Sequence, residues 1–219
     1  MHIKILSGIC ILLVGCGGQS AGDASAPVTS ISCDDAPMCA DWLSAHNDLR
    51  ARLSEGAIAD DGTQGAYPVP ATALPALVWD AQLAAVAQQY ADKCSWGHNS
   101  ARKSQYQAAG GTFSSVGENI AYKAYSSTQK TSADVLPELF NLWANENTDW
   151  HYQAYQSASI NGAGHFSQLI WADTSHVGCA ISECSSLANA DVPAGYKIFY
   201  AVCDYSPAGN YIGEFPYEI

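Results

Sequence analysis

Two histidines and two glutamates are the side chains of this sequence best suited to chemistry: His98, Glu118, Glu146 and His165. Imidazole nitrogens bind divalent metals such as zinc, and a carboxylate can act as a general base towards a water molecule. The gaps between the four residues are long, and no His-x-x-x-His pair marks a helical zinc site. Spacing alone leaves their convergence open, and it favours a hydrogen-bonded structural cluster over a metal site.

The two carboxylates stand out through their surroundings rather than their type. Glu118 lies in the stretch GENI over residues 117–120, which we interpret as an apolar-leaning turn after a glycine. Glu146 falls seven residues after Leu139 and three after Trp143, so it extends the apolar stripe of a predicted helix. A carboxylate there is costly unless it is paired or hydrogen-bonded. Imidazoles are natural partners, because they offer donors and titrate near neutral pH.

The remaining histidines and one nearby serine are weaker candidates. His46 lies on the apolar face of a predicted helix, so we expect a hydrogen-bonded core histidine. His151 and His176 stand in polar stretches that suggest no partner. Ser167 follows His165 by two residues, but nothing in the sequence places a base and an orienting acid around it, so no activated nucleophile is predicted.

The spacing of apolar residues predicts three helices and two strands. One helix covers residues 41–53, a second follows its N-cap Asp80, and a third runs from Pro137 to about Asn147, with Pro137 in its first turn. Residues 176–184 and 197–205 have strand character, and 55–75, 95–115 and 185–195 are predicted loops. Helices around a small sheet, without a repeat, predict one α/β or α+β sandwich domain.

Composition excludes one class of partner. The 219 residues are 48% apolar, which is typical of a globular domain. The formal net charge is −12, and a surface so negative repels nucleic-acid phosphates. We therefore expect no nucleic-acid partner.

The N-terminus has the pattern of an export signal. Residues 1–15 combine Lys4 with an apolar run that is too short to span a bilayer, and they predict a signal peptide. The run ends in LVGC, which resembles a bacterial lipobox, so we expect Cys16 to carry the lipid and residues 16–37 to form a flexible tether. The alternative is an ordinary secretory signal with an incidental cysteine. The folded domain is predicted over residues 38–219.

The other cysteines agree with export. Six remain outside the leader and the lipobox, and no pair has Cys-x-x-Cys spacing. An even number in an exported chain favours disulfides over metal thiolates, although six cysteines allow fifteen connectivities. The six are Cys33, Cys39, Cys94, Cys179, Cys184 and Cys203.

Five stretches, in this order, resemble the CAP superfamily of cysteine-rich secretory proteins, antigen 5 and pathogenesis-related 1 proteins, also called SCP domains. They are HNDLR at 46–50, LVWD at 77–80 with CSWGHNS at 94–100, GENI at 117–120, HFSQLIW at 165–171 with GCA at 178–180, and CDYSPAGNY at 203–211. The resemblance spans about Cys39 to Tyr217. It implies an α+β fold, a three-layer α-β-α sandwich with a central antiparallel sheet and a large open cleft.

The resemblance also implies a site and a disulfide pattern. The cleft would hold His98, Glu118, Glu146 and His165. The two histidines would be ligands for zinc or another divalent cation, and the two glutamates the candidate catalytic carboxylates. Expected disulfides are Cys94–Cys184 and Cys179–Cys203, which leave Cys33–Cys39 by default. The sequence departs from the plant pattern at Ala163, where a cysteine often stands, and in the length of the loop between His98 and Glu118.

We therefore expect a CAP-domain protein anchored in a bacterial cell envelope, facing the periplasm or the exterior. Its cleft would bind a lipid or another small apolar ligand, and enzyme activity is not favoured. Two alternatives stay open: a metal-dependent hydrolase of peptide or cell-envelope ester bonds, with Glu118 or Glu146 as general base, and a surface interaction protein whose cleft is not catalytic.

Overall fold

The computed structural model describes residues 38–58, 67–126, 129–157 and 163–219. The predicted signal peptide, the lipidation site Cys16 and the tether over residues 16–37 lie outside these ranges. Among the described helices, none has the length and apolar composition needed to cross a membrane.

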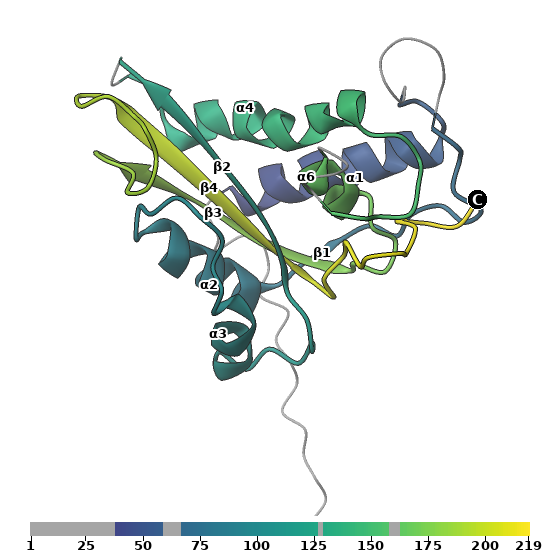
Figure 1. Cartoon of the computed structure of the whole chain (residues 1–219). Helices are drawn as coiled ribbons and strands as arrows, with labels where there is room; N and C mark the ends of the chain where they lie inside the picture. The colour runs from purple at the N-terminus through teal and green to yellow at the C-terminus, as the bar shows by residue number, and fades with distance from the viewer. Residues whose placement is uncertain (1–37, 59–66, 127–128, 158–162) are drawn as a thin grey trace, which may run out of the picture. The chain divides into compact units, whose positions relative to one another are not determined.

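A four-stranded sheet forms the centre of the domain, in the order β1-β3-β4-β2. The three long strands are antiparallel neighbours, and the short β1 pairs with β3 in parallel. Strand β2 therefore lies at one edge of the sheet (Figure 1). The strand bounds are β1 (Val78–Trp79), β2 (Gly117–Tyr125), β3 (His176–Cys184) and β4 (Lys197–Ser206).

Helices cover both faces of this sheet, which confirms the predicted α-β-α sandwich (Figure 1). Side chains alternate along a strand, so Phe199 and Tyr205 of β4 join the core beneath the first helical layer, while Tyr200 and Val202 pack beneath the second. The first layer contains α1 (Cys39–Ser54), α4 (Ser132–Ala144) with the 3₁₀ helix η2 (Asn145–Asp149), and α6 (Gly164–Leu169). The second contains α2 (Ala81–Ala91) and α3 (Arg102–Ala108).

Local signals fix the ends of two helices. Asp80 is the N-cap of α2, as predicted, and its Oδ1 accepts from the backbone N–H groups of Gln82 and Leu83 at 2.8 and 3.0 Å. Helix α4 begins at Ser132, where Thr131 and Asp134 form a reciprocal capping box. The prediction that Pro137 lies in the first turn was therefore wrong. Pro137 has no N–H to donate to the carbonyl of Ala133, four residues earlier in the helix. Both residues are exposed, so water can reach that carbonyl and the helix tolerates the proline.

Two further expectations were wrong. The predicted loop over residues 95–115 contains α3, a short helix with a polar sequence that buries only Tyr106. The predicted turn around Glu118 is instead the start of β2, which pairs with β4 along its whole length. Glycine, glutamate and asparagine are poor strand formers, so tertiary pairing decides the conformation here.

Both disulfides implied by the family resemblance are present. Cys94–Cys184 joins the chain just after α2 to the end of β3, and Cys179–Cys203 links register partners on β3 and β4. Cys39 is also disulfide-bonded, and its expected partner Cys33 lies outside the described residues.

One glycine sets the contact between α2 and the sheet. Gly178 of β3 lies directly beneath the first turn of α2. A Cβ atom at this position would lie 2.1 Å from the backbone nitrogen of Ala84 and 2.6 Å from the carbonyl oxygen of Asp80. Only glycine allows the two backbones to come this close.

Candidate functional site

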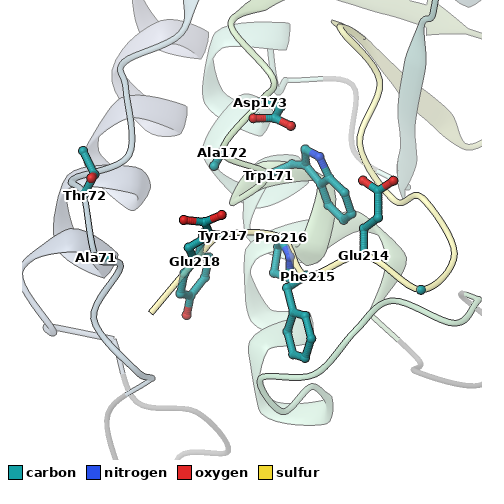
Figure 2. Close-up of a pocket in the computed structure, with 11 residues that line it drawn as sticks. Ala71, Thr72, Trp171, Ala172, Asp173, Glu214, Phe215, Pro216, Tyr217 and Glu218 are labelled. Carbon is teal, nitrogen blue, oxygen red and sulfur yellow. The ribbon is translucent and has the colours of Figure 1, made fainter.

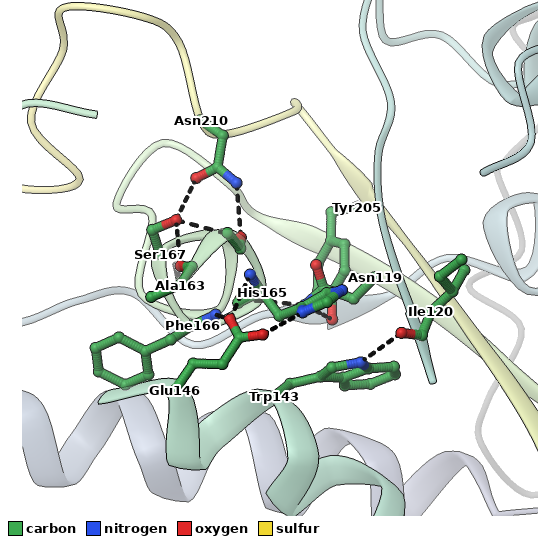
Figure 3. Close-up of polar contacts among 11 residues, drawn as sticks. Asn119, Ile120, Trp143, Glu146, Ala163, His165, Phe166, Ser167, Tyr205 and Asn210 are labelled. Atoms are coloured by element: carbon green, nitrogen blue, oxygen red, sulfur yellow. Dashed lines mark hydrogen bonds and ion pairs between the residues drawn. The ribbon is translucent and has the colours of Figure 1, made fainter. Parts of the chain in front are cut away.

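His165 and Glu146 form the first of two histidine–glutamate pairs. His165 lies at the start of α6, and Glu146 in η2 faces it (Figure 3). The Nδ1 of His165 lies 2.5 Å from Oε1 of Glu146. Oε2 of the same carboxylate accepts the backbone N–H groups of His165 and Phe166 at 2.9 and 3.2 Å. Glu146 thus fixes both the imidazole and the helix end that carries it.

His98 and Glu118 form the second pair. His98 follows α2 and the Cys94–Cys184 disulfide, and its Nδ1 lies 2.8 Å from Oε1 of Glu118 on β2. The same oxygen accepts the backbone N–H of Asn99 at 2.9 Å. The Glu118 side chain is fully buried, whereas 58% of the His98 side chain is exposed. A buried carboxylate therefore orients an exposed imidazole.

In both pairs the carboxylate contacts Nδ1, and Nε2 of the ring has no hydrogen-bond partner in the described part of the chain. A carboxylate at Nδ1 favours the tautomer with its proton on Nδ1, so the neutral ring presents the lone pair of Nε2. Carboxylates hold metal-binding histidines in this way in many proteins. The prediction that imidazoles partner the two glutamates is borne out for each pair.

The two pairs approach β2 from opposite faces of the sheet. Glu118 shares its face with Ile120, which packs in the α2 core, while Glu146 and His165 belong to the α4 layer. Because β2 is an edge strand, both pairs lie near its free edge. The structure therefore groups the four predicted site residues as two separate histidine–glutamate pairs.

A hollow of about 190 Å³ opens at this edge. The Glu146–His165 pair lines one part of it, and His98 and Glu118 are not among its lining residues. The rest of its wall is apolar and aromatic, formed by Trp96, Ile120, Ala121, Tyr122, Leu142 and Trp143. A polar end against an apolar wall suits a small amphipathic molecule.

Two supporting residues were missed by the sequence analysis. Asn119 donates through Nδ2 to the backbone carbonyl of His165 at 3.2 Å and to the hydroxyl of Tyr205 at 3.3 Å (Figure 3). The Trp143 ring stacks near His165, with the ring centroids 6.3 Å apart. Asn119 follows Glu118 directly, so the two side chains serve the two pairs from opposite faces of one strand. The GEN motif at residues 117–119 was the sequence signal that could have pointed to Asn119.

His46 is a core histidine, as predicted. Its side chain is fully buried, with Nδ1 2.7 Å from the carbonyl of Trp42 and Nε2 2.9 Å from the hydroxyl of Tyr205. Burial lowers the pKa of His46 to about 4, and the charge of Arg50 adds to this, while the hydrogen bond to Trp42 opposes it. His46 also lies beside Cys179 and Cys203, but their sulfurs form a disulfide and offer no thiolate to a metal.

Two other candidates have structural partners. The hydroxyl of Ser167 donates to Oδ1 of Asn210 at 2.7 Å and faces the carbonyls of Ala163 and Gly164 (Figure 3). These contacts connect the start of α6 to Asn210. His176 contacts the hydroxyl of Ser175 at 2.8 Å through Nδ1.

Two larger cavities lie away from the histidine pairs. One, of about 480 Å³, lies against the C-terminal residues, where Asp173, Glu214 and Glu218 surround the rings of Trp171 and Tyr217 (Figure 2). The other, of about 460 Å³, is a groove between α1 and α4. Its wall includes Ala45, Leu136 and Phe140, with Asp41 and Asp48 among the lining residues.

The fold and the paired site define a disulfide-linked α-β-α domain, and comparison with known proteins identifies its family. Residues 43–205 match the CAP model, described as the cysteine-rich secretory protein family, and the chain belongs to this family. It is 31% identical over 172 residues to venom allergen 5 of Microctonus hyperodae, covering 78% of this chain and 67% of the relative. Venom allergen 5.02 of Vespa crabro is 33% identical over 179 residues, with coverages of 80% and 77%.

Solved structures agree with this family. The crystal structure of NaASP2 with Zn²⁺ superposes with a TM-score of 0.66 at 26% identity, covering 82% of this chain and 84% of that one. The structure of BmVAL-1 gives the same TM-score and identity, with coverages of 82% and 81%.

Proposed function

We propose that this CAP domain is a binding module for a small apolar or lipid-like molecule with one hydrogen-bonding group. The observation that best supports this proposal is the hollow at the free edge of β2, where aromatic and aliphatic walls meet the Glu146–His165 pair. Apolar contact would supply most of the affinity. The free Nε2 of His165 would orient the polar group of the ligand.

Each of the two histidines is a possible ligand for a divalent cation by the chemistry of its donor, although the described residues do not gather the two pairs into one compact three-ligand cluster. His98 and His165 each have Nδ1 against a carboxylate, which leaves Nε2 as the metal-binding atom. A structural neighbour was crystallised with Zn²⁺, which supports zinc as the first cation to test. A bound zinc ion would supply a Lewis acid at the edge of β2. The contacts of Ser167 with two carbonyls and an amide give no support to a serine nucleophile, so a hydrolase here would rely on a water molecule and a glutamate base.

We propose further that the domain acts outside the cytoplasm, held to a bacterial membrane by a lipid on Cys16. Disulfides persist in oxidising compartments, so the two pairs among the described residues support export. The LVGC sequence supports the anchor. Replacing Cys16 by serine tests it, because a protein that still partitions with membranes would refute the anchor.

Ligand binding can be tested with the full chain by native mass spectrometry and tryptophan fluorescence. Oleate, cholesterol and a total bacterial lipid extract serve as probes, because Trp96 and Trp143 line the hollow and should report occupancy. Leu142→Glu places a charge at the wall of the hollow and should weaken binding at least tenfold. Val78→Glu is the matched control, since Val78 is also an exposed apolar residue but lies on β1.

The outcomes separate the alternatives. Lipid adducts that both variants retain equally would place the binding site elsewhere, for example in the groove between α1 and α4. Turnover of peptide or ester substrates that a His98→Ala, His165→Ala double variant abolishes would favour the hydrolase. Zinc binding that survives in this double variant would refute the two histidines as ligands.

A further inference from the structure

Glu118 has a second acidic neighbour, which the histidine pairing does not explain. Asp204 of β4 is the register partner of Glu118 on β2, so the two side chains lie side by side on the same face of the sheet. Asp204 is fully buried, and so is the side chain of Glu118. Two carboxylates therefore lie side by side where water does not reach them.

Three oxygens of these two carboxylates lack a partner. Oε2 of Glu118 and both Oδ atoms of Asp204 are buried, with no hydrogen-bond donor in the described part of the chain. Arg102 is the neighbouring cation, but it donates to the carbonyls of Val116 and Asn99. On the other side of Asp204, the register partner on β3 is Gly178, which has no side chain to offer. Because Arg102 donates to backbone carbonyls and not to these oxygens, two adjacent buried carboxylates could both stay ionised only at a large cost.

We propose that Asp204 is a neutral carboxylic acid in the native protein and donates its proton in a hydrogen bond to Oε2 of Glu118. One proton satisfies an oxygen on each residue and removes the repulsion between them. Asp204 then holds Oε2 of Glu118, while His98 and Asn99 hold Oε1. Asp204 is thus a positioning residue for His98, and this role does not depend on the proposed binding of a ligand.

The electrostatics of the surroundings agree with this assignment. Burial raises the pKa of Asp204 well above its usual value, and the negative charge of Glu118 raises it further. Arg102 opposes this rise and is the weakest of the three influences. Among the described residues, the hydroxyls of Tyr200 and Tyr205 also interact with Asp204, and burial raises the pKa of both.

The decisive variant is Asp204→Asn, because an asparagine amide can donate the same hydrogen bond but cannot ionise. In wild type the native state keeps a proton that the unfolded chain loses above its ordinary aspartate pKa. Wild type should therefore lose stability relative to Asp204→Asn as the pH rises, with the ratio of the two unfolding constants changing about tenfold per pH unit while Asp204 stays protonated. Urea unfolding from about pH 5 to about pH 8 measures this ratio. The contribution of His46 cancels, because both proteins retain it.

Controls distinguish a shared proton from a bound cation. Asp173→Asn replaces an exposed aspartate and should show no such pH-dependent ratio. A ratio for Asp204→Asn that also stays constant with pH would overturn the proposal. So would a stabilisation of wild type by CaCl₂ or ZnCl₂ that Asp204→Asn lacks, because a cation would then hold the two carboxylates together.

A second measurement does not depend on the variant folding. Infrared spectra of native wild type at about pH 7, with and without carboxyl-¹³C aspartate, should show the C=O band of a protonated aspartic acid. Absence of that band would overturn the proposal.

For the positioning role, ¹⁵N NMR should find the same His98 tautomer in wild type and Asp204→Asn, and a changed tautomer in Asp204→Ala. An unchanged tautomer in Asp204→Ala would refute that role. None of these readouts needs a ligand, so they stand apart from a failure of the proposed function.

Discussion

The indole Nε1 of Trp143 donates to the backbone carbonyl of Ile120 across 3.0 Å. This bond ties α4 to the free edge of β2, at the hollow that both residues line. The Trp143 ring also stacks near His165, so one side chain supports the apolar wall and the polar end of the hollow.

Removing that bond should cost stability. We expect Trp143→Phe to lower the free energy of unfolding by about 1–3 kcal/mol through the unsatisfied Ile120 carbonyl, with a further loss from the smaller ring. Trp42→Phe is a matched control, because Trp42 stacks on Trp143 at 5.7 Å and its buried Nε1 has no partner among the described residues. Urea unfolding should show the smaller loss for Trp42→Phe. Equal losses would mean that the hydrogen bond contributes nothing.

Glu146→Gln should disturb the polar end of the hollow. The carboxylate faces three N–H donors, from the His165 ring and from the backbone of His165 and Phe166, and a glutamine amide would turn a donor towards one of them. We expect a loss of about 1–3 kcal/mol in unfolding free energy and a changed ¹⁵N shift of the His165 ring. The exposed Glu55→Gln should change neither value. An unchanged His165 spectrum in Glu146→Gln would contradict the pairing.

His46 predicts a pH dependence of the opposite sign to that of Asp204. Its pKa is lowered to about 4 in the native state, from an ordinary value of 6.5. Between these values the unfolded chain binds a proton that the native state does not, so stability falls as the pH decreases through this range, by about 3 kcal/mol in total. Unfolding of wild type and His46→Gln at several pH values measures the difference. If the two proteins lose stability in parallel, His46 is not the group responsible.

The two disulfides should differ in their contribution to stability. Cys94–Cys184 joins residues 90 apart in sequence and Cys179–Cys203 residues 24 apart. The chain-entropy model gives about 4.5 kcal/mol for the longer loop and about 3.5 kcal/mol for the shorter one. Paired alanine variants compared by urea unfolding test the order. A larger loss for the shorter loop would show that native packing outweighs chain entropy.

Sequence reasoning succeeded where one element determined the outcome. The position of His46 followed from helical periodicity, and the N-cap role of Asp80 from its residue type. The costly position of Glu146 at the end of an apolar stripe predicted a partner, and His165 provides one. Each of these depended on a few neighbouring residues.

Relations between distant elements could not be derived in that way. Spacing did not show that Glu118 meets His98 or that Glu146 meets His165, and only the family resemblance grouped the four residues. Strand β2 begins with residues that form strands poorly, and it exists because β4 pairs with it. Asp204 carried no local signal, because its environment arises from the register between β2 and β4.

The close contact at Gly178 also constrains how this domain can vary. Helix α2 leads through Cys94 to His98, so the height of α2 above β3 determines where the His98 ring meets Glu118. A single methyl group at position 178 would lift the start of this helix while the disulfide holds the chain beyond its other end. The resulting tilt would be transmitted along α2 to the His98 imidazole, so a glycine two strands away from Glu118 controls the alignment of the His98–Glu118 pair.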